Sequence, residues 1–446
     1  MKTASIITWI ALLMVQQASF AQTTVISDIR LIDGNGKLPG KNVDMVIKAD
    51  RIWAIYLHGS NKFPTDAKMV NMSGKTMIPG LINSHAHLGL LKGPVSSAGN
   101  YSEENILRQL KKYEDFGVTQ VLSMGSDHDM IAGMRDSSRQ GLLPGATIFT
   151  AIHGFGALGG GPPSSMIDQV LRPQTAGEAV KMVQQLVPLK PDVLKIWVDD
   201  FGGGSPKMQP EIYTAIINEA HKNGIRVAAH VYYLEDARKL VAAGLDIIAH
   251  SIRDKEIDDD LLKAMKSKNV IYIPTLSLDE YNFIYAGKPA WLNDPFFQAS
   301  IEPGLLDTLK SESYIKRLQN DPAREKKMAD FRMAVQNLNK IFKAGIKVAM
   351  GTDSGAQPVR AQGFSEHLEL QLMLEAGLSS LEAITCATRN GAQVLKIDHD
   401  YGSLSVGKKA DFIILSGNPL ENMKLSQSIV SVWRSGFKVS DGPLGK

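Results

Sequence analysis

Six residues that could bind a metal stand inside or directly after short apolar segments. His85 and His87 are two residues apart, so on a β-strand their side chains point to the same side. Lys195 lies in the apolar segment 193–198, where a lone ammonium group would be costly to bury. The full set is His85, His87, Lys195, His230, His250 and Asp353. Imidazole and carboxylate groups are typical ligands of divalent metals, so the set predicts a metal site.

Each of these residues has a simpler explanation when it is taken alone. A buried histidine more often bonds a backbone carbonyl than a metal, and an aspartate after a strand often caps the next helix. A lysine can also extend its ammonium group to the rim of a barrel. Six such groups converging on one face from five strands are hard to explain by packing, and the joint pattern therefore favours a metal site.

The middle of the chain repeats an apolar strand followed by a helical pattern. Eight strand candidates end near His87, Gly125, His153, Asp199, Tyr232, Ser251, Leu276 and Asp353, and the helical candidates include 103–116, 176–187, 211–222, 236–243 and 333–344. This alternation demands a parallel sheet, and eight units are typical of an α/β fold of the (β/α)8 TIM-barrel class, whose chemistry lies where the strands end. An open doubly wound sheet is the alternative, although no G-x-G-x-x-G follows the first strand.

The two ends of the chain contain short strands separated by turn signals. We expect residues 22–78 and 399–446 to form the two parts of one small β-sandwich domain, and residues 79–398 to form the barrel. Residues 277–330 make an unusually long connection after the seventh strand, and they carry Tyr281, Phe283, Tyr285, Trp291, Phe296 and Phe297. We interpret this segment as a lid that lines an apolar or aromatic pocket, with a purely structural helical insertion as the alternative.

Composition excludes several classes of protein. The 446 residues carry 49 basic and 46 acidic side chains, a net charge of +3 without long single-sign blocks, so no nucleic-acid partner is expected. The single cysteine, Cys386, excludes an internal disulfide framework and a Cys-based zinc site, and it is most simply a buried thiol.

Residues 1–21 are typical of a secretory signal peptide. Lys2 precedes an apolar run, and small residues stand before an expected cleavage after Ala21. The run of ten residues is shorter than the roughly 20 needed to span a bilayer. We therefore expect a periplasmic or secreted protein with no membrane partner after cleavage, and an uncleaved anchor is the alternative.

The motifs around these residues resemble a known superfamily. His85-Ala-His87 within the segment 77–87, then Lys195, His230, His250 and Gly351-Thr-Asp353-Ser, resemble the metal-dependent amidohydrolases. The segments 375–392 and 402–415 are most similar to the imidazolonepropionase-like and prolidase-like branch. Asn83 departs from the family motif, which usually carries Asp at this position. Because this residue is not a metal ligand in the family, we interpret the change as an adjustment of the site rather than as its loss.

The resemblance implies a binuclear centre, most simply of zinc, with manganese, cobalt or iron as alternatives. One ion would be held by His85, His87 and Asp353, and the other by His230 and His250. Lys195 would bridge both after reacting with CO₂ to form a carbamate, which makes it N6-carboxylysine. Asp353 would be a catalytic residue as well as a ligand, acting as general base toward a metal-activated water and then as general acid toward the leaving group.

Three further residues are candidates for substrate contact. His153 follows the third strand and could donate a hydrogen bond to the reacting carbonyl as charge develops, which would make it a second catalytic residue. Tyr232 lies two residues after His230 and resembles a tyrosine that binds substrate in prolidase-like relatives, although a rim aromatic is an equal alternative. Arg253 could pair with a substrate carboxylate, although a solvated surface arginine is the simpler explanation.

These residues favour an exported hydrolase of a C–N amide or peptide bond in a small-molecule substrate such as a dipeptide or an N-acyl amino acid. A mononuclear cyclic-amide hydrolase would leave Lys195 unexplained, and a deaminase would need a glutamate soon after His230, where His-Val-Tyr-Tyr stands. Lactone or ester hydrolysis is a further alternative. A non-catalytic binding protein is another, but such a protein should lack some of the metal ligands, and none of the six is missing here. Because relatives commonly form dimers or larger assemblies, the resemblance also implies a homo-oligomer.

Overall fold

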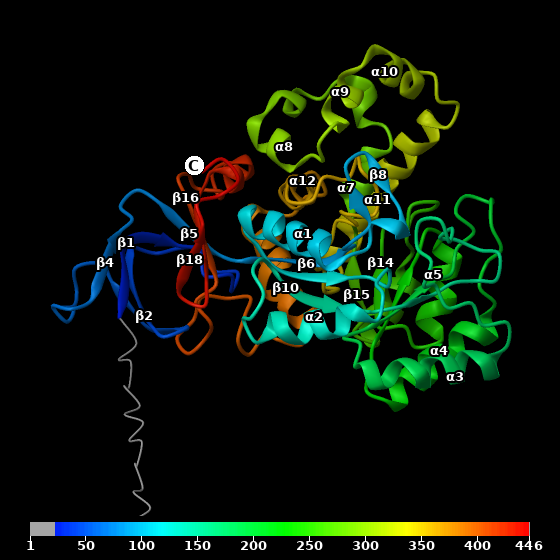
Figure 1. Ribbon diagram of the computed structural model, residues 1–446, viewed down its shortest axis with the longest axis horizontal. Helices are drawn as coiled ribbons and strands as arrows, with labels where there is room; N and C mark the ends of the chain where they lie inside the picture. The colour runs from blue at the N-terminus through cyan, green and yellow to red at the C-terminus, as the bar shows by residue number, and fades with distance from the viewer. Residues whose placement is uncertain (1–22, 446) are drawn as a thin grey trace, which may run out of the picture.

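The computed structural model describes residues 23–445, which form a strand-rich part and a larger part in which strands and helices alternate (Figure 1). The predicted signal segment 1–21 lies outside the described residues. Among the helices that are described, none is both long enough and apolar enough to cross a bilayer.

The strand-rich part brings the two ends of the chain into one sheet. Its strands are β1 (Thr24–Leu31), β2 (Val43–Lys48), β3 (Arg51–Leu57), β4 (Lys68–Asn71), β5 (Thr76–Pro79), β16 (Phe412–Leu415), β17 (Ile429–Arg434) and β18 (Phe437–Ser440). Their order is β18-β17-β16-β5-β1-β2-β3, with β4 paired to β1. Phe412 and Trp433 stack in its core, with ring centroids 5.4 Å apart. The strands join into one continuous sheet, so the two-layered sandwich stays a prediction.

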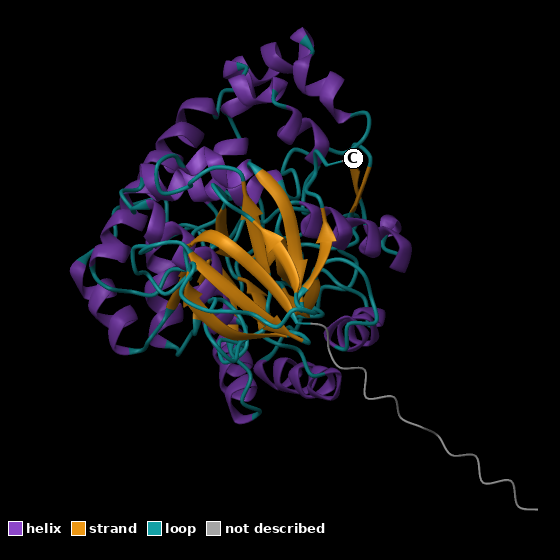
Figure 2. Ribbon diagram, turned by 90° about the vertical axis from the view of Figure 1, so that its left-hand side faces the viewer, coloured by secondary structure: helices purple, strands orange, loops and turns teal. Residues whose placement is uncertain are grey.

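The larger part has the parallel strands that the alternating pattern predicts. They are β6 (Leu81–Ala86), β9 (Val118–Ser123), β10 (Thr147–Thr150), β11 (Gly154–Phe155), β12 (Leu194–Trp197), β13 (Val227–His230), β14 (Ile247–Ala249) and β15 (Ile271–Ile273). They form two sheets, β10-β9-β6 and β11-β12-β13-β14-β15, in which every pair is parallel. Figure 2 shows strands in the middle of the molecule with helices around them. The two parallel sheets and the helices that alternate with their strands make a TIM-barrel-type α/β arrangement.

The predicted eighth strand is not a regular strand. Residues 347–354 lie between the two sheets: the Lys347 carbonyl accepts from the Tyr272 amide of β15, and the Met350 carbonyl accepts from the Ser84 amide of β6. At Thr352 the regular ladder ends, because the amides of Thr352 and Asp353 both donate to the carbonyl of His85. The assigned strands therefore do not close into one barrel, although this segment links both edges.

Helices cover the sheets. They are α1 (Glu103–Asp115), α2 (Met130–Arg139), α3 (Ala176–Leu186), α4 (Pro210–Lys222), α5 (Leu234–Ala242), α6 (Asp259–Ser267), α11 (Arg324–Lys343), α12 (Phe364–Glu375), α13 (Ser380–Thr385) and α14 (Gly391–Val394). Ile106, Leu110 and Tyr113 of α1 are buried at helical spacing, and the Ser102 side chain accepts from the Asn105 amide at its start. The predicted helices match to within about two residues, except that the one expected at 333–344 begins at Arg324.

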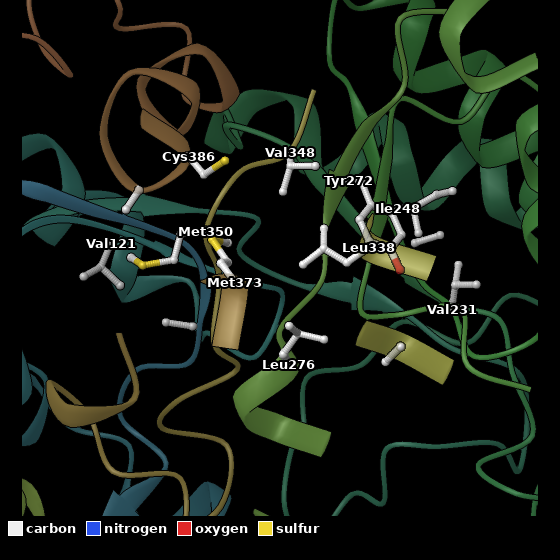
Figure 3. Close-up of a cluster of buried hydrophobic side chains, with 14 of the residues drawn as sticks. Val121, Val231, Ile248, Tyr272, Leu276, Leu338, Val348, Met350, Met373 and Cys386 are labelled. Carbon is white, nitrogen blue, oxygen red and sulfur yellow. The ribbon is translucent and has the colours of Figure 1, made fainter. Parts of the chain in front are cut away.

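The core beneath the site is apolar and includes the only cysteine of the sequence. Figure 3 shows Val121, Ile248, Tyr272, Val348 and Met350 from the strand segments packed against side chains of the helices. Cys386 is buried in this cluster, as expected for a thiol that serves as core filler.

The long insertion is a helical subdomain that stands above the sheets in Figure 1. It contains α7 (Leu276–Tyr281), α8 (Pro295–Ser300), α9 (Leu305–Lys310), α10 (Glu312–Gln319) and short 3-10 turns. Its aromatic side chains pack on one another and on α12: Trp291 lies 4.7 Å from Phe297, and Phe297 lies 5.0 Å from Phe364, between ring centroids. The apolar side chains of the insertion are therefore continuous with the main core through α12.

Candidate metal centre

The six predicted metal-binding residues come from strand ends on one face of the sheets. His85 lies near the end of β6, Lys195 lies in β12, and His230 is the last residue of β13. His87 and His250 directly follow β6 and β14, and Asp353 lies near the end of the irregular eighth segment. Because neighbouring parallel strands run in the same direction, their carboxyl ends meet at the same face. Five of the six residues are buried, and His230 is partly exposed.

Two imidazoles and one carboxylate form the tightest group. Asp353 Oδ1 lies 3.2 Å from His85 Nε2 and 3.0 Å from His87 Nε2. One ligand atom from each of these three residues lies within 4.8 Å of the others, which is close enough for one cation to contact all three.

The other three residues, Lys195, His230 and His250, lie next to this group. The Lys195 Nζ atom lies 3.4 Å from His85 Nε2. The ring of His250 is 4.5 Å from that of His85 and 4.2 Å from that of His230, measured between centroids. The structure thus brings all six residues together, although they span positions 85 to 353 of the chain.

Burial sets the protonation states of this cluster. It lowers the pKa of His85 to about 3 and that of Lys195 to about 7. Burial also lowers the pKa of His250 well below its usual value, and the cationic forms of neighbouring His230 and His85 would add to this shift. Burial opposes ionisation of Asp353, but Arg360 and His85 outweigh it and hold the pKa of this carboxyl well below its usual range. Unprotonated imidazoles beside an ionised carboxylate are the donor set that a divalent metal needs, so these residues fit such an ion.

Several side chains around the cluster orient its members, and the sequence patterns did not single them out. The Nδ1 atom of His87 bonds Ser126 Oγ at 2.8 Å, and the Nδ1 atom of His250 bonds Thr275 Oγ1 at 2.9 Å. Asp199 Oδ2 lies 3.4 Å from His230 Nε2. All three stand at or beside predicted strand ends, near Gly125, Asp199 and Leu276, and this position is the one signal that could have found them.

A cavity of about 650 Å³ opens onto the cluster through His87, His230 and Asp353. One part of its lining is apolar and the other is charged. The apolar residues include Pro162, Met166, Ile167, Trp197, Phe201 and Leu278, and the charged residues include Asp199, Arg253, Asp279, Lys326, Asp330 and Arg360.

Two of the three predicted substrate residues line this cavity. The hydroxyl of Tyr232 donates to Asp330 Oδ2 at 2.8 Å and also contacts the Lys326 ammonium. Arg253 is buried rather than solvated, and its Nε lies 3.0 Å from Asp279 Oδ1. Both residues already have protein partners, so a substrate would have to compete with these partners or share them.

Two expectations about substrate contact are not met. His153 is not among the cavity residues, and its Nε2 bonds Asp129 at 2.7 Å. The prediction that aromatic residues of the insertion line the pocket is wrong, because these residues bury one another. The insertion and α11 instead contribute Leu278, Asp279, Asn282, Ala323, Lys326, Lys327 and Asp330 to the lining.

Comparison with known proteins agrees with this architecture. Ochratoxinase of Aspergillus niger is 31% identical over 243 residues, which cover 53% of this chain and 42% of that protein, so the match spans less than half of that relative. Imidazolonepropionase of Brevibacillus brevis is 23% identical over 78% of this chain and 76% of its own. A solved Xaa-Pro dipeptidase with bound methionine superimposes with a TM-score of 0.75 at 23% identity, covering 94% of this chain and 99% of its own.

At that identity the solved structure supports the fold alone. The decisive comparison is the family model described as the amidohydrolase family, which matches residues 76–439 and so includes all six clustered residues. The chain therefore belongs to the amidohydrolase family of hydrolytic enzymes.

Proposed function

We propose that this protein is a binuclear metal-dependent hydrolase that cleaves a C–N amide or peptide bond in a dipeptide or an N-acyl amino acid. The observation that carries the proposal is the convergence of His85, His87, Lys195, His230, His250 and Asp353 at the floor of one cavity. His85, His87 and Asp353 would hold one ion, and His230 and His250 the other. When bound, such ions acidify water and polarise a carbonyl.

Lys195 is suited to bridge the two proposed metal ions. Its pKa of about 7 leaves about half of its amine unprotonated at neutral pH, and an unprotonated amine can attack CO₂. The reaction forms one N–C bond and releases one proton to water, which gives a carbamate with two oxygens and a negative charge. An anion at this position offsets dications and removes the cost of a buried ammonium.

Asp353 is suited to move the proton of the reaction. Its Oδ1 faces His85 and His87, and its Oδ2 pairs with Arg360. A carboxylate held ionised at the cavity floor can accept a proton from the attacking water and then pass it to the departing amine. Arg360 keeps this carboxylate charged between turnovers, because it favours the ionised form.

The cavity supports a small amphipathic substrate. Its apolar lining suits the side chain or acyl group of such a molecule, and its charged lining contains Arg253 and Lys326, which suit a carboxylate. Dipeptides and N-acyl amino acids carry both features on either side of an amide bond. The Xaa-Pro dipeptidase that superimposes on this chain acts on dipeptides, which belong to this class.

Metal analysis of the purified protein tests the proposal. We expect close to two zinc equivalents per chain after loading, and fewer in Lys195→Ala, because the bridging group is lost. Lys222→Ala is the matched control, since Lys222 lies on the surface of α4 and pairs with Glu219. One equivalent in the unmodified protein would favour a mononuclear enzyme, and none would favour a non-catalytic binding protein.

A substrate panel then tests the reaction. Xaa-Pro and Xaa-Arg dipeptides, N-acyl amino acids, lactones and aryl amides are incubated with the zinc-loaded protein, with Lys195→Ala alongside. Release of a free amino acid that is lost in the variant is expected. Turnover confined to lactones would contradict the amide proposal.

A further inference from the structure

A buried carboxylate that belongs to neither the metal cluster nor the cavity lies directly behind the cluster. Glu366, in the first turn of α12, is fully buried. Its Oε1 accepts from Asn83 Nδ2 at 2.6 Å, Thr352 Oγ1 at 2.8 Å and Ser354 Oγ at 2.8 Å. Its Oε2 accepts from the Gly363 amide at 2.7 Å, which ties the carboxylate to the start of the helix.

These bonds join the two segments that carry the closest ligand pair. Asn83 precedes His85 by two residues on β6, and its Oδ1 accepts from the His85 amide at 3.0 Å. Thr352 and Ser354 flank Asp353 on the irregular segment. Glu366 therefore holds both segments at one point, directly behind the place where His85 Nε2 and Asp353 Oδ1 lie 3.2 Å apart.

The amide of Asn83 is required by this arrangement. An asparagine side chain offers two N–H donors and one acceptor oxygen. Here Asn83 Nδ2 donates to Glu366 Oε1 and to Thr352 Oγ1, and Asn83 Oδ1 accepts from the His85 amide. An ionised aspartate would keep the bond from the His85 amide but would bring a second acceptor against Glu366 Oε1. Two buried acceptors without a hydrogen between them are strongly unfavourable.

We propose that Asn83 and Glu366 are a matched pair of positioning residues that set the spacing of His85 and Asp353 for the metal. This inference rests on the proposed metal site, and it explains why residue 83 is Asn in this chain. It implies that Asp, which the resembled motif carries at this position, is the wrong residue in this chain as long as residue 366 is Glu.

An exchange of donor and acceptor tests the pair. The variants are Asn83→Asp, Glu366→Gln and the double variant, in which a glutamine amide can donate to the new aspartate. Zinc affinity is measured by competition with a chromophoric chelator, and the cobalt(II) absorption spectrum reports the ligand geometry. Neither readout depends on knowing the substrate.

Asn337→Asp is the matched control. Asn337 on α11 is equally buried, its Nδ2 donates to the carbonyls of Ile252 and Lys255, and its Oδ1 accepts from the Ile257 amide. This variant introduces the same chemical change at a residue whose bonds go to backbone groups rather than to Glu366. Thermal unfolding of every variant shows how much stability each change costs.

Asn83→Asp is expected to weaken zinc binding by about 10- to 100-fold, the usual effect of losing a partner that orients a ligand. The double variant should recover most of the affinity and the cobalt spectrum, whereas Asn337→Asp should lower the unfolding temperature without changing either.

The inference is overturned if Asn83→Asp binds zinc as the unmodified protein does, or if it loses no more affinity than Asn337→Asp. Absence of recovery in the double variant also overturns the matched pair. If Asn83→Asp does not fold, the zinc affinity of Glu366→Gln tests the proposal instead. A zinc affinity of Glu366→Gln equal to that of the unmodified protein would then count against the proposal. Failure of the unmodified protein to bind metal would instead overturn the proposed function.

Discussion

At the scale of single residues, the two oxygens of Asp353 have different neighbours. Oδ1 faces two imidazoles, and Oδ2 faces the guanidinium of Arg360. This division lets one carboxylate contact an ion with one oxygen while the other stays in a charged pair beside the cavity. The arrangement suits a group that has to bind and also exchange a proton.

Asp353→Asn should therefore lower kcat by about 10²- to 10⁴-fold, because the amide is not basic enough to take up the proton. The measurement is steady-state turnover of the best substrate from the panel, with metal content determined in parallel. Asp168→Asn is the control, since Asp168 pairs with His128 and is not one of the residues that line the cavity. Near-normal turnover of Asp353→Asn with full metal content would remove Asp353 from the proton-transfer role.

At the scale of elements, strained backbone marks the places where strands end at the cluster. His250, Thr275 and Asp353 have φ angles of 72°, 52° and 56°, in the left-handed region that residues with side chains rarely adopt. Such conformations cost about 1–3 kcal/mol each and persist only where the surrounding structure enforces them. Here they turn His250 and Asp353 toward the cluster and bring Thr275 Oγ1 to His250 Nδ1.

Thr275→Val should weaken metal binding at His250 by about 10- to 100-fold, because it keeps the shape of the side chain and removes the partner of Nδ1. Thr275→Ser keeps the hydroxyl and should bind metal nearly as the unmodified protein does. Chelator competition and metal content compare the two variants. Equal affinity of valine and serine variants would show that the hydroxyl does not orient His250.

At the scale of the whole molecule, α12 connects the barrel region to the C-terminal part of the chain. Its residue His367 bonds the carbonyl of Phe116, which follows α1, and the hydroxyl of Ser426 in the 3-10 helix η6 (Met423–Gln427). Burial lowers the pKa of His367 to about 4. The folded protein therefore holds this ring neutral at pH values where the unfolded chain protonates it.

Stability should consequently fall as the pH is lowered from 6.5 toward 4. In this window the unfolded chain binds more protons at this site, so His367 contributes its full effect above pH 6.5 and loses about 3 kcal/mol by pH 4. Urea unfolding at several pH values measures the slope, which should be smaller in His367→Gln. His221→Gln, at a half-exposed histidine of α4, is the control. Equal slopes in His367→Gln and the unmodified protein would contradict this prediction.

Part of the site could be predicted from local patterns. Short apolar segments followed by His, Lys or Asp mark buried strands and their ends, and parallel strands bring such ends to one face. This reasoning is sufficient for His85, His87, Lys195, His230, His250 and Asp353. It does not distinguish His153, which also follows a strand but bonds Asp129 and is not among the residues that line the cavity.

The rest depends on contacts between distant residues. Asn83 and Glu366 are 283 positions apart, and no spacing in the chain connects them. Arg360 and the partners of Tyr232 and Arg253 come from loops and helices whose directions are set by packing rather than by periodicity. Likewise, the aromatic residues of the insertion have an apolar composition that suits either a pocket or a core.

The sequence by itself determined the repeating strand-helix order, the family and the chemical identity of the six clustered groups, because these properties are encoded in neighbouring residues. Tertiary structure alone decided where the insertion buries its aromatic side chains, which charged residues line the cavity and which buried partners orient the ligands. Those features arise only when segments far apart in the chain compete for the same space and the same hydrogen bonds, and a linear pattern does not record that competition.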